Sequence, residues 1–169
     1  MAHPVNLPRH LRMWLTSRGS LTRKLKVHCA HFSVDPVATG FALAHADEYA
    51  PLQLRSNSLA YVREVLLMCD DHPVVYAHSV LPCAGLRGGW NEITRLGTRP
   101  LGEALFSNPR IQREALAYRP IDARHPLFRA ATQKHPLLAR VLWARRSVFR
   151  LNGQPLLVTE VFLPEIEKR

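Results

Sequence analysis

The chain has 169 residues, 47% of them hydrophobic and 21% charged, which suits one globular domain over residues 1–169 rather than a disordered protein. Its formal net charge of +10 suggests an anionic partner: a small molecule, a nucleic acid or an acidic membrane surface. No apolar run approaches the length of a membrane span, and the N-terminus lacks the apolar segment of a signal peptide. We therefore expect a cytoplasmic protein.

Cysteines and histidines give no sign of a metal centre. Cys29, Cys69 and Cys83 have no paired spacing, and an odd number of cysteines without a secretion signal predicts free thiols. The nine histidines include no HExxH motif and no close pair at helical spacing, and there is no CxxC. We therefore expect neither a metal nor a cofactor.

The first 58 residues begin with two predicted helices. One covers 8–17, where apolar residues recur at helical spacing after Pro8, and a second starts at Ser20, a suitable N-cap. Alternation over 26–34 predicts a strand, and 35–58 carry few clear signals.

A hairpin is predicted next, from strands at 61–68 and 74–82. With Asp71 and His72 as a two-residue turn, Val65 pairs with His78, and Arg63 pairs with Val80. Arg63 and His78 would then share a largely apolar face of the hairpin. A buried arginine there would suit bidentate binding of a carboxylate. The alternative is an arginine that reaches solvent along an exposed face.

The middle of the chain is predicted to be mainly helical. Residues 84–97 suggest loop and short helix, and a helix over 98–106 is entered through Thr98 and Pro100. Its first free N–H groups, including that of Leu101, could bind a carboxylate, and the same holds more weakly at Leu21. Residues 111–119 fit strand or helix, and 125–142 predict a helix in two pieces broken at Pro136.

The last hairpin consists of strands 145–151 and 155–163 around Asn152-Gly153, the strongest hairpin signal in the chain. Counting back from this turn places Arg145 opposite Glu160, a carboxylate in an otherwise apolar strand. Glu160 is then either a structural ion-pair partner or a group with a chemical role, and the hairpin alone does not decide between them. Together the elements predict an α+β fold with an antiparallel sheet.

Three segments in order, YVREVLLMCDDHPVVYAHSVLP, LGTRPLGEALF and WARRSVFRLNGQPLLVTEVFLP, resemble the chorismate lyase family. The resemblance covers most of residues 11–164. It implies an antiparallel sheet with helices packed on one side, covering an internal ligand cavity. It also implies conversion of chorismate to 4-hydroxybenzoate and pyruvate, the first step of ubiquinone synthesis, without metal or cofactor.

The resemblance also assigns residues. Arg63 is expected to bind the ring carboxylate, with Leu21 and Leu101 lining the same site and Glu160 beside the hydroxyl group, where it is the candidate base. His78, where the family has arginine, is a candidate second cation. No binding to nucleic acid is expected, because the basic residues are scattered along the sequence. The chain is also expected to be a monomer.

The alternative is a non-catalytic, small-molecule-sensing domain, as in bacterial transcription regulators of the same fold. Such domains follow a DNA-binding module, whereas this sequence begins almost at once with the domain itself.

Overall fold

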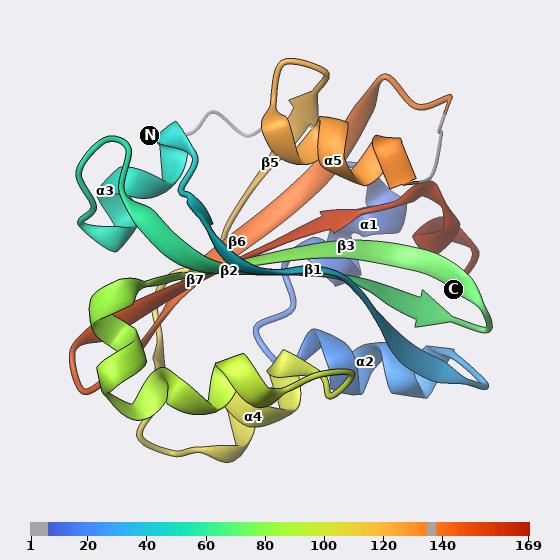
Figure 1. Ribbon diagram of the computed structural model, residues 1–169. Coiled ribbons are helices and arrows are strands. Elements are labelled where there is room, and N and C mark those ends of the chain that lie inside the picture. Colours follow the sequence, from blue (N-terminus) through green and yellow to red (C-terminus); the bar gives the residue numbers. More distant parts are fainter. Residues whose placement is uncertain (1–6, 135–137) are drawn as a thin grey trace.

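The sheet organises the whole chain (Figure 1). A computed structural model describes residues 7–134 and 138–169, and within them seven strands form one antiparallel sheet in the order β1-β2-β3-β7-β6-β4, with β5 also paired to β6. The strands are β1 (Phe32–Leu43), β2 (Leu59–Cys69), β3 (His72–Pro82), β4 (Gln112–Arg113), β5 (Ala117–Asp122), β6 (Val141–Leu151) and β7 (Gln154–Phe162).

Helices connect the strands. The α-helices are α1 (Arg9–Leu15), α2 (Leu21–His28), α3 (Tyr49–Leu52), α4 (Leu101–Ser107) and α5 (Pro126–Lys134). The 3₁₀ helices are η1 (Ala46–Glu48), η2 (Cys83–Arg87), η3 (Gly89–Arg95) and η4 (Pro164–Lys168). None of the helices in the described part of the chain has the length and apolar character needed to cross a membrane. The predicted helices at 8–17, after Ser20 and at 98–106 are confirmed by α1, α2 and α4.

Helices cover both faces of the sheet. One face carries Arg63, Ser79 and Glu160, and its apolar residues pack against α1, α2 and α4. We call it the lower face, because α2 and α4 lie below the strands in Figure 1. The upper face carries Glu64 and His78 and packs against α3 and α5. The α+β fold class is confirmed. The helices, however, lie on two sides rather than one, because the sheet is apolar on both faces.

The β6–β7 hairpin has the predicted register. Asn152 and Gly153 both have positive φ (51° and 78°), as a two-residue turn of this kind requires. Leu151 pairs with Gln154, and the count back to the pair of Arg145 and Glu160 is correct. The Asn-Gly turn therefore fixes which side chains share a face over the whole hairpin.

The register predicted for the β2–β3 hairpin is wrong. Its turn is Asp70-Asp71, both with positive φ, and a bulge between Leu67 and Met68 shifts the pairing. Arg63 pairs with Ser79, and His78 pairs with Glu64. Since adjacent residues of a strand point to opposite faces, His78 lies on the upper face, away from Arg63.

Three further expectations are corrected by the structure. Residues 26–28 end helix α2, so the strand predicted over 26–34 begins only at Phe32. The ambiguous stretch 111–119 contains β4 and the start of β5. No second helix follows α5 within the described part of 125–142, since Val141 already begins β6. The predicted break at Pro136 lies outside the described residues.

The prediction of free thiols is wrong for two of the three cysteines. Cys29 and Cys69 form a disulfide, with their Cα atoms 5.3 Å apart and 40 positions between them in sequence. Strand pairing explains the contact: Phe32, at the start of β1, pairs with Cys69, and Cys29 directly follows α2. Cys83 is free and exposed. Long-range pairing of this kind leaves no spacing pattern in the sequence.

Candidate active site

A cavity lies between the lower face of the sheet and helices α2 and α4, which lie next to each other beneath the strands in Figure 1. Its walls are largely apolar, with a few charged side chains. The lining includes Leu21, Thr22, Val34, Arg63, Val65, Leu67, Ala77, Ser79, Leu101, Gly102, Leu105, Phe106, Arg113, Arg145, Phe149, Val158 and Glu160. Of the five residues predicted for the site, four line this cavity: Leu21, Arg63, Leu101 and Glu160.

Arg63 is a buried cation without a carboxylate partner among the described residues. Its exposed fraction is 3%, and its Nη2 donates to the carbonyl oxygens of Gly97 (3.1 Å) and Arg99 (3.0 Å). Burial lowers the pKa of Arg63 from its usual value, although the group stays charged near neutral pH. The rest of its guanidinium is available to an anion in the cavity.

The starts of α2 and α4 meet at the cavity wall. The Ser20 hydroxyl caps α2 by accepting from the backbone N–H of Arg23 (3.3 Å). A Cβ atom on Gly102 would lie 2.8 Å from Oγ1 of Thr22, so only glycine permits this approach of the two helices. Leu21 and Leu101, each the first residue of its helix, are thereby brought together as the sequence predicted.

Glu160 is held by Arg145 at the cavity wall. Arg145, 1% exposed, donates from Nε to Oε2 of Glu160 (2.5 Å) and from Nη1 to the carbonyls of Trp14 (2.7 Å) and Ser17 (2.9 Å). Oε1 of Glu160 has no hydrogen bond to the residues the structure describes. The ion pair of the structural alternative is therefore present, and because Oε1 has no partner among the described residues, the geometry is compatible with the chemical alternative as well.

Arg113 is a third cation of the cavity, and it was missed from the sequence. It donates from Nε to Oγ of Ser147 (3.0 Å) and from Nη1 to the carbonyl of Arg18 (2.5 Å). Its guanidinium also lies 5.3 Å from the ring centre of Phe149. Burial, and then the charge of Arg145, lower the pKa of Arg113. The sequence of 111–119 fitted strand and helix alike, so it did not indicate where Arg113 points.

The charged groups of the cavity do not cancel. Arg63, Arg113 and Arg145 contribute three positive charges and Glu160 one negative charge, which leaves a formal charge of +2 in a mostly apolar enclosure. Electrostatic attraction is strong where water is excluded. This arrangement suits a flat, partly apolar ligand that carries two negative charges.

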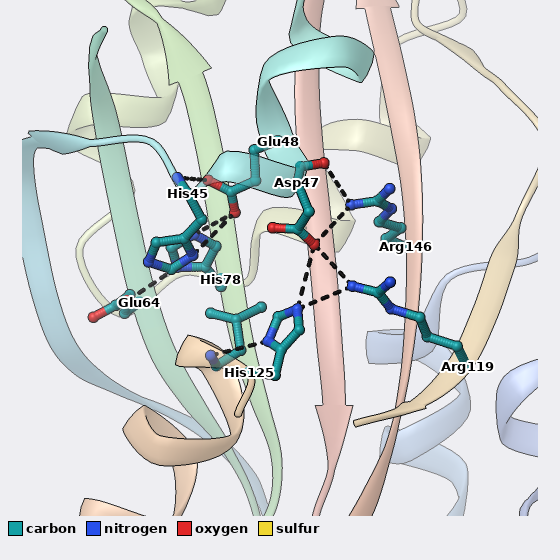
Figure 2. A network of polar contacts seen from close by, with 9 residues as sticks. His45, Asp47, Glu48, Glu64, His78, Arg119, His125 and Arg146 are labelled. Carbon is teal, nitrogen blue, oxygen red and sulfur yellow. Dashed lines mark hydrogen bonds and ion pairs between the residues drawn. The ribbon is translucent and has the colours of Figure 1, made fainter. Parts of the chain in front are cut away.

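His78 lies on the upper face, in the polar network of Figure 2. Its Nδ1 donates to Glu64 Oε1 (2.9 Å), and its Nε2 is 2.9 Å from Oε1 of the buried Glu48. Burial opposes charge on the ring, but the two carboxylates outweigh it and raise the pKa of His78 to about 9. His78 is therefore not a group of the cavity, contrary to the prediction that placed it beside Arg63.

Asp47 is the second centre of the upper network. Its Oδ2 contacts Arg119 (2.9 Å), Arg146 (3.3 Å) and His125 (3.3 Å), as Figure 2 shows. Asp47 and Glu48 lie in the stretch 35–58, which carries few local signals. Their contacts join elements far apart in the chain, so local patterns do not reveal them.

Comparison with solved structures shows the same fold in other bacterial proteins. PhnF from Mycobacterium smegmatis gives a TM-score of 0.58 at 17% identity, covering 89% of this chain and 66% of that one. The ligand-binding domain of a putative GntR-family regulator from Bordetella bronchiseptica gives 0.55 at 17% identity, covering 81% and 85%. At such low identity the similarity concerns the fold alone.

Sequence comparison is more specific. A protein of Thiobacillus denitrificans named "Probable chorismate pyruvate-lyase" is 55% identical, over 98% of this chain and 89% of that protein. A protein of the same name from Nitrosomonas eutropha is 48% identical, over 98% and 93%. The family model described as Chorismate lyase matches residues 3–169. With matches over nearly its whole length, the chain belongs to the chorismate lyase family.

Proposed function

We propose that the chain converts chorismate to 4-hydroxybenzoate and pyruvate in the cavity beneath the sheet. The observation that carries this proposal is the cavity's formal charge of +2, with Arg63 buried and unpaired by any carboxylate of the described residues. Chorismate is a dianion with a six-membered carbon ring, so its charge and partly apolar character match this enclosure. The names of the relatives support the same reaction.

Arg63 and the helix starts are proposed to orient the substrate. The guanidinium would bind the ring carboxylate, and the free N–H groups at the starts of α2 and α4 would assist, since Leu21 and Leu101 both line the cavity. Such contacts hold the ring in one reactive orientation, which is a large part of what an intramolecular elimination requires.

Glu160 is proposed to receive the proton. The reaction removes the proton from the hydroxyl-bearing ring carbon and breaks the neighbouring C–O bond. The electron pair of that C–H bond enters the ring, which becomes aromatic, and enolpyruvate leaves and becomes pyruvate. Glu160 bonds Arg145 through Oε2 and has Oε1 free to accept a hydrogen bond from the hydroxyl or a proton. Arg113 and Arg145 would stabilise the negative charge that develops on enolpyruvate.

The test is direct. Purified full-length chain is mixed with chorismate in the presence of a metal chelator, and 4-hydroxybenzoate and pyruvate are quantified separately. Equal amounts of both are expected, at a rate far above that of chorismate alone. Absence of product, or product only when metal is added back, would overturn the proposal.

The wider setting follows from the same reaction. We propose that the product feeds ubiquinone synthesis, in the cytoplasm, and that the chain acts as a monomer without nucleic acid. A sensing domain that binds its ligand unchanged is the alternative. Recovery of intact chorismate from the mixture would favour that alternative.

A further inference from the structure

A second cluster of chemically active side chains lies on the upper face, separated from the cavity by the sheet (Figure 2). It consists of His45, just before η1; Glu48, the last residue of η1; and His78 in β3. Nδ1 or Nε2 of each histidine and a carboxylate oxygen of Glu48 all lie within 4.8 Å of one another. Glu48 and His78 are 2% and 3% exposed, so the cluster is built into the protein rather than spread over its surface.

The donor atoms are held by surrounding contacts. Glu48 accepts the backbone N–H of His45 with Oε2 (2.8 Å), which turns Oε1 toward the imidazole rings. Oε1 is 2.9 Å from Nε2 of His78 and 3.6 Å from Nδ1 of His45. Glu64 binds the other ring nitrogen of His78 (2.9 Å). A carboxylate on the far nitrogen is the usual outer partner of a metal-binding histidine.

Two of these atoms lack a hydrogen-bond partner. Within the described residues, Nδ1 of His45 and Nε2 of His78 are buried and make no hydrogen bond, although Nε2 lies close to Glu48. Buried polar atoms are nearly always satisfied, by protein, water or an ion. Nε2 of His78 pairs with Glu48 while the ring is protonated; once that proton is lost, the two buried nitrogens and Oε1 of Glu48 form a set of donors for a cation.

We propose that His45, Glu48 and His78 bind a divalent first-row transition metal ion, with Zn²⁺ as the best match. Two imidazoles and one carboxylate suit zinc and its neighbours, whereas Mg²⁺ and Ca²⁺ prefer oxygen ligands. Three protein ligands leave one position of a tetrahedral shell for water. The site goes beyond the proposed function, because Arg63 and Glu160 face the other side of the sheet. It also departs from the expectation that the chain has no metal site.

An ion can reach the site and be enclosed by a local movement. His45 and His78 border a surface groove along β1, together with Thr39 and Phe41. The two rings are parallel within 7°, with centres 5.0 Å apart, so one ion cannot lie in both ring planes until one ring turns. His45, whose side chain is 29% exposed, is the ring with room to do so.

The test uses full-length protein stripped of metal by a chelator and then dialysed. Calorimetric titration with ZnCl₂ near pH 8 should give one tight site per chain, and because the pKa of His78 is about 9 in the metal-free protein, binding should release a proton from its ring. His45→Gln removes the exposed ligand and spares the buried core, and it should weaken binding more than 100-fold, beyond the roughly 10–100-fold loss typical of an outer partner. Glu64→Gln, an outer-partner change, should weaken binding about 10-fold. His72→Gln, on an exposed histidine of the β2–β3 hairpin, is the matched control and should change nothing.

Substitution of Co²⁺ gives a second readout. The visible absorption of a tetrahedral nitrogen–oxygen site should appear in wild type and His72→Gln and be absent in His45→Gln. No tight Zn²⁺ binding to wild type, or equally tight binding to His45→Gln, would overturn the proposal. Neither result bears on lyase activity, which is measured in chelator, so the two proposals fail separately.

Discussion

The two faces of the sheet use charge in opposite ways. On the lower face, the cavity contains three arginines and one carboxylate. Only Arg145 pairs with that carboxylate, and Arg63 is bonded only to carbonyl oxygens among the described residues. On the upper face, His78 lies between two carboxylates, and Asp47 is surrounded by Arg119, Arg146 and His125. In β2 and β6 the two faces are supplied by adjacent residues: Arg63 and Glu64 in β2, and Arg145 and Arg146 in β6.

This difference separates the residues that bind an anionic ligand from those that stabilise the folded protein. A buried cation without an internal counter-ion is costly to the free protein, and the cost is recovered when an anionic ligand arrives. A charge already paired inside the protein contributes to folding and has little left for an anionic ligand. Changes on the lower face should therefore affect turnover and affinity, and changes on the upper face should affect stability.

The largest effect is expected from Glu160→Gln. Glutamine keeps the shape and can still hydrogen-bond a hydroxyl, but it cannot take a proton, so turnover of chorismate should fall about 10²–10⁴-fold. Folding and binding of 4-hydroxybenzoate should be retained. Steady-state kinetics on folded protein measures this, with Glu114→Gln, a surface carboxylate paired with Arg150, as control. Wild-type turnover in Glu160→Gln would leave this carboxylate with a purely structural role.

Next in size is the loss of ligand affinity in Arg63→Ala. Removing a charged, desolvated contact should weaken 4-hydroxybenzoate binding by about 2–5 kcal/mol in calorimetry. Arg146→Ala, which changes an arginine of the upper face bonded to Asp47, should leave that affinity unchanged. Equal losses in both variants would contradict the division between the two faces.

The ion pairs of the upper face should make the free energy of unfolding depend on pH. His78 has a pKa of about 9 in the folded protein against 6.5 for the free side chain, so its stabilising contribution is complete below about pH 6.5 and lost as pH rises through 9. The loss is about 3 kcal/mol by linkage. Glu48, whose pKa is lowered by the same contact, loses its contribution as pH falls below its usual value of 4.5, so stability should peak between these limits.

Urea unfolding of chelator-treated protein at a series of pH values measures this. His78→Gln should flatten the alkaline side of the profile. An unchanged alkaline profile in His78→Gln would mean that the ring is neutral in the folded protein.

The smallest effect is expected from Gly102→Ala. The added methyl group would meet the Thr22 hydroxyl at 2.8 Å, which forces the starts of α2 and α4 apart. We expect about 1–3 kcal/mol of destabilisation in thermal unfolding, as for other overpacked contacts, together with weaker 4-hydroxybenzoate binding. Adding Thr22→Ser to Gly102→Ala keeps the clashing hydroxyl and removes only a methyl group. The double variant should therefore regain little stability and little 4-hydroxybenzoate affinity. Full stability in Gly102→Ala would show that the helix starts can separate freely.

Local signals account for what the sequence predicted well. The Asn152-Gly153 turn fixes the β6–β7 register, and this turn alone was enough to predict that Arg145 lies opposite Glu160. The helix starts at Leu21 and Leu101 were readable from Ser20 and Pro100. The family resemblance then supplied the reason why these residues share one cavity.

The failures have two physical sources: an unusual local turn, and contacts between distant parts of the chain. Asp70 and Asp71 adopt positive φ although neither is glycine, so the prediction placed the β2–β3 turn one residue too late. Together with the bulge near that turn, this error shifted the register by one residue and assigned His78 to the wrong face of the sheet. Arg113 enters the cavity through a two-residue strand that no periodicity can reveal. The partners of Glu48 and Cys29 depend on the sheet already being assembled.

The disulfide between Cys29 and Cys69 has a consequence for how a protease would cut the chain. Its covalent loop contains β1, η1, α3 and most of β2, including the exposed turn around Arg55 and Asn57. Trypsin cleavage at Arg55 would therefore leave both fragments joined as one molecule of unchanged mass, apart from one added water. Two bands would appear on a denaturing gel only after reduction, so an intact band without reductant is no proof of an uncut backbone in this protein.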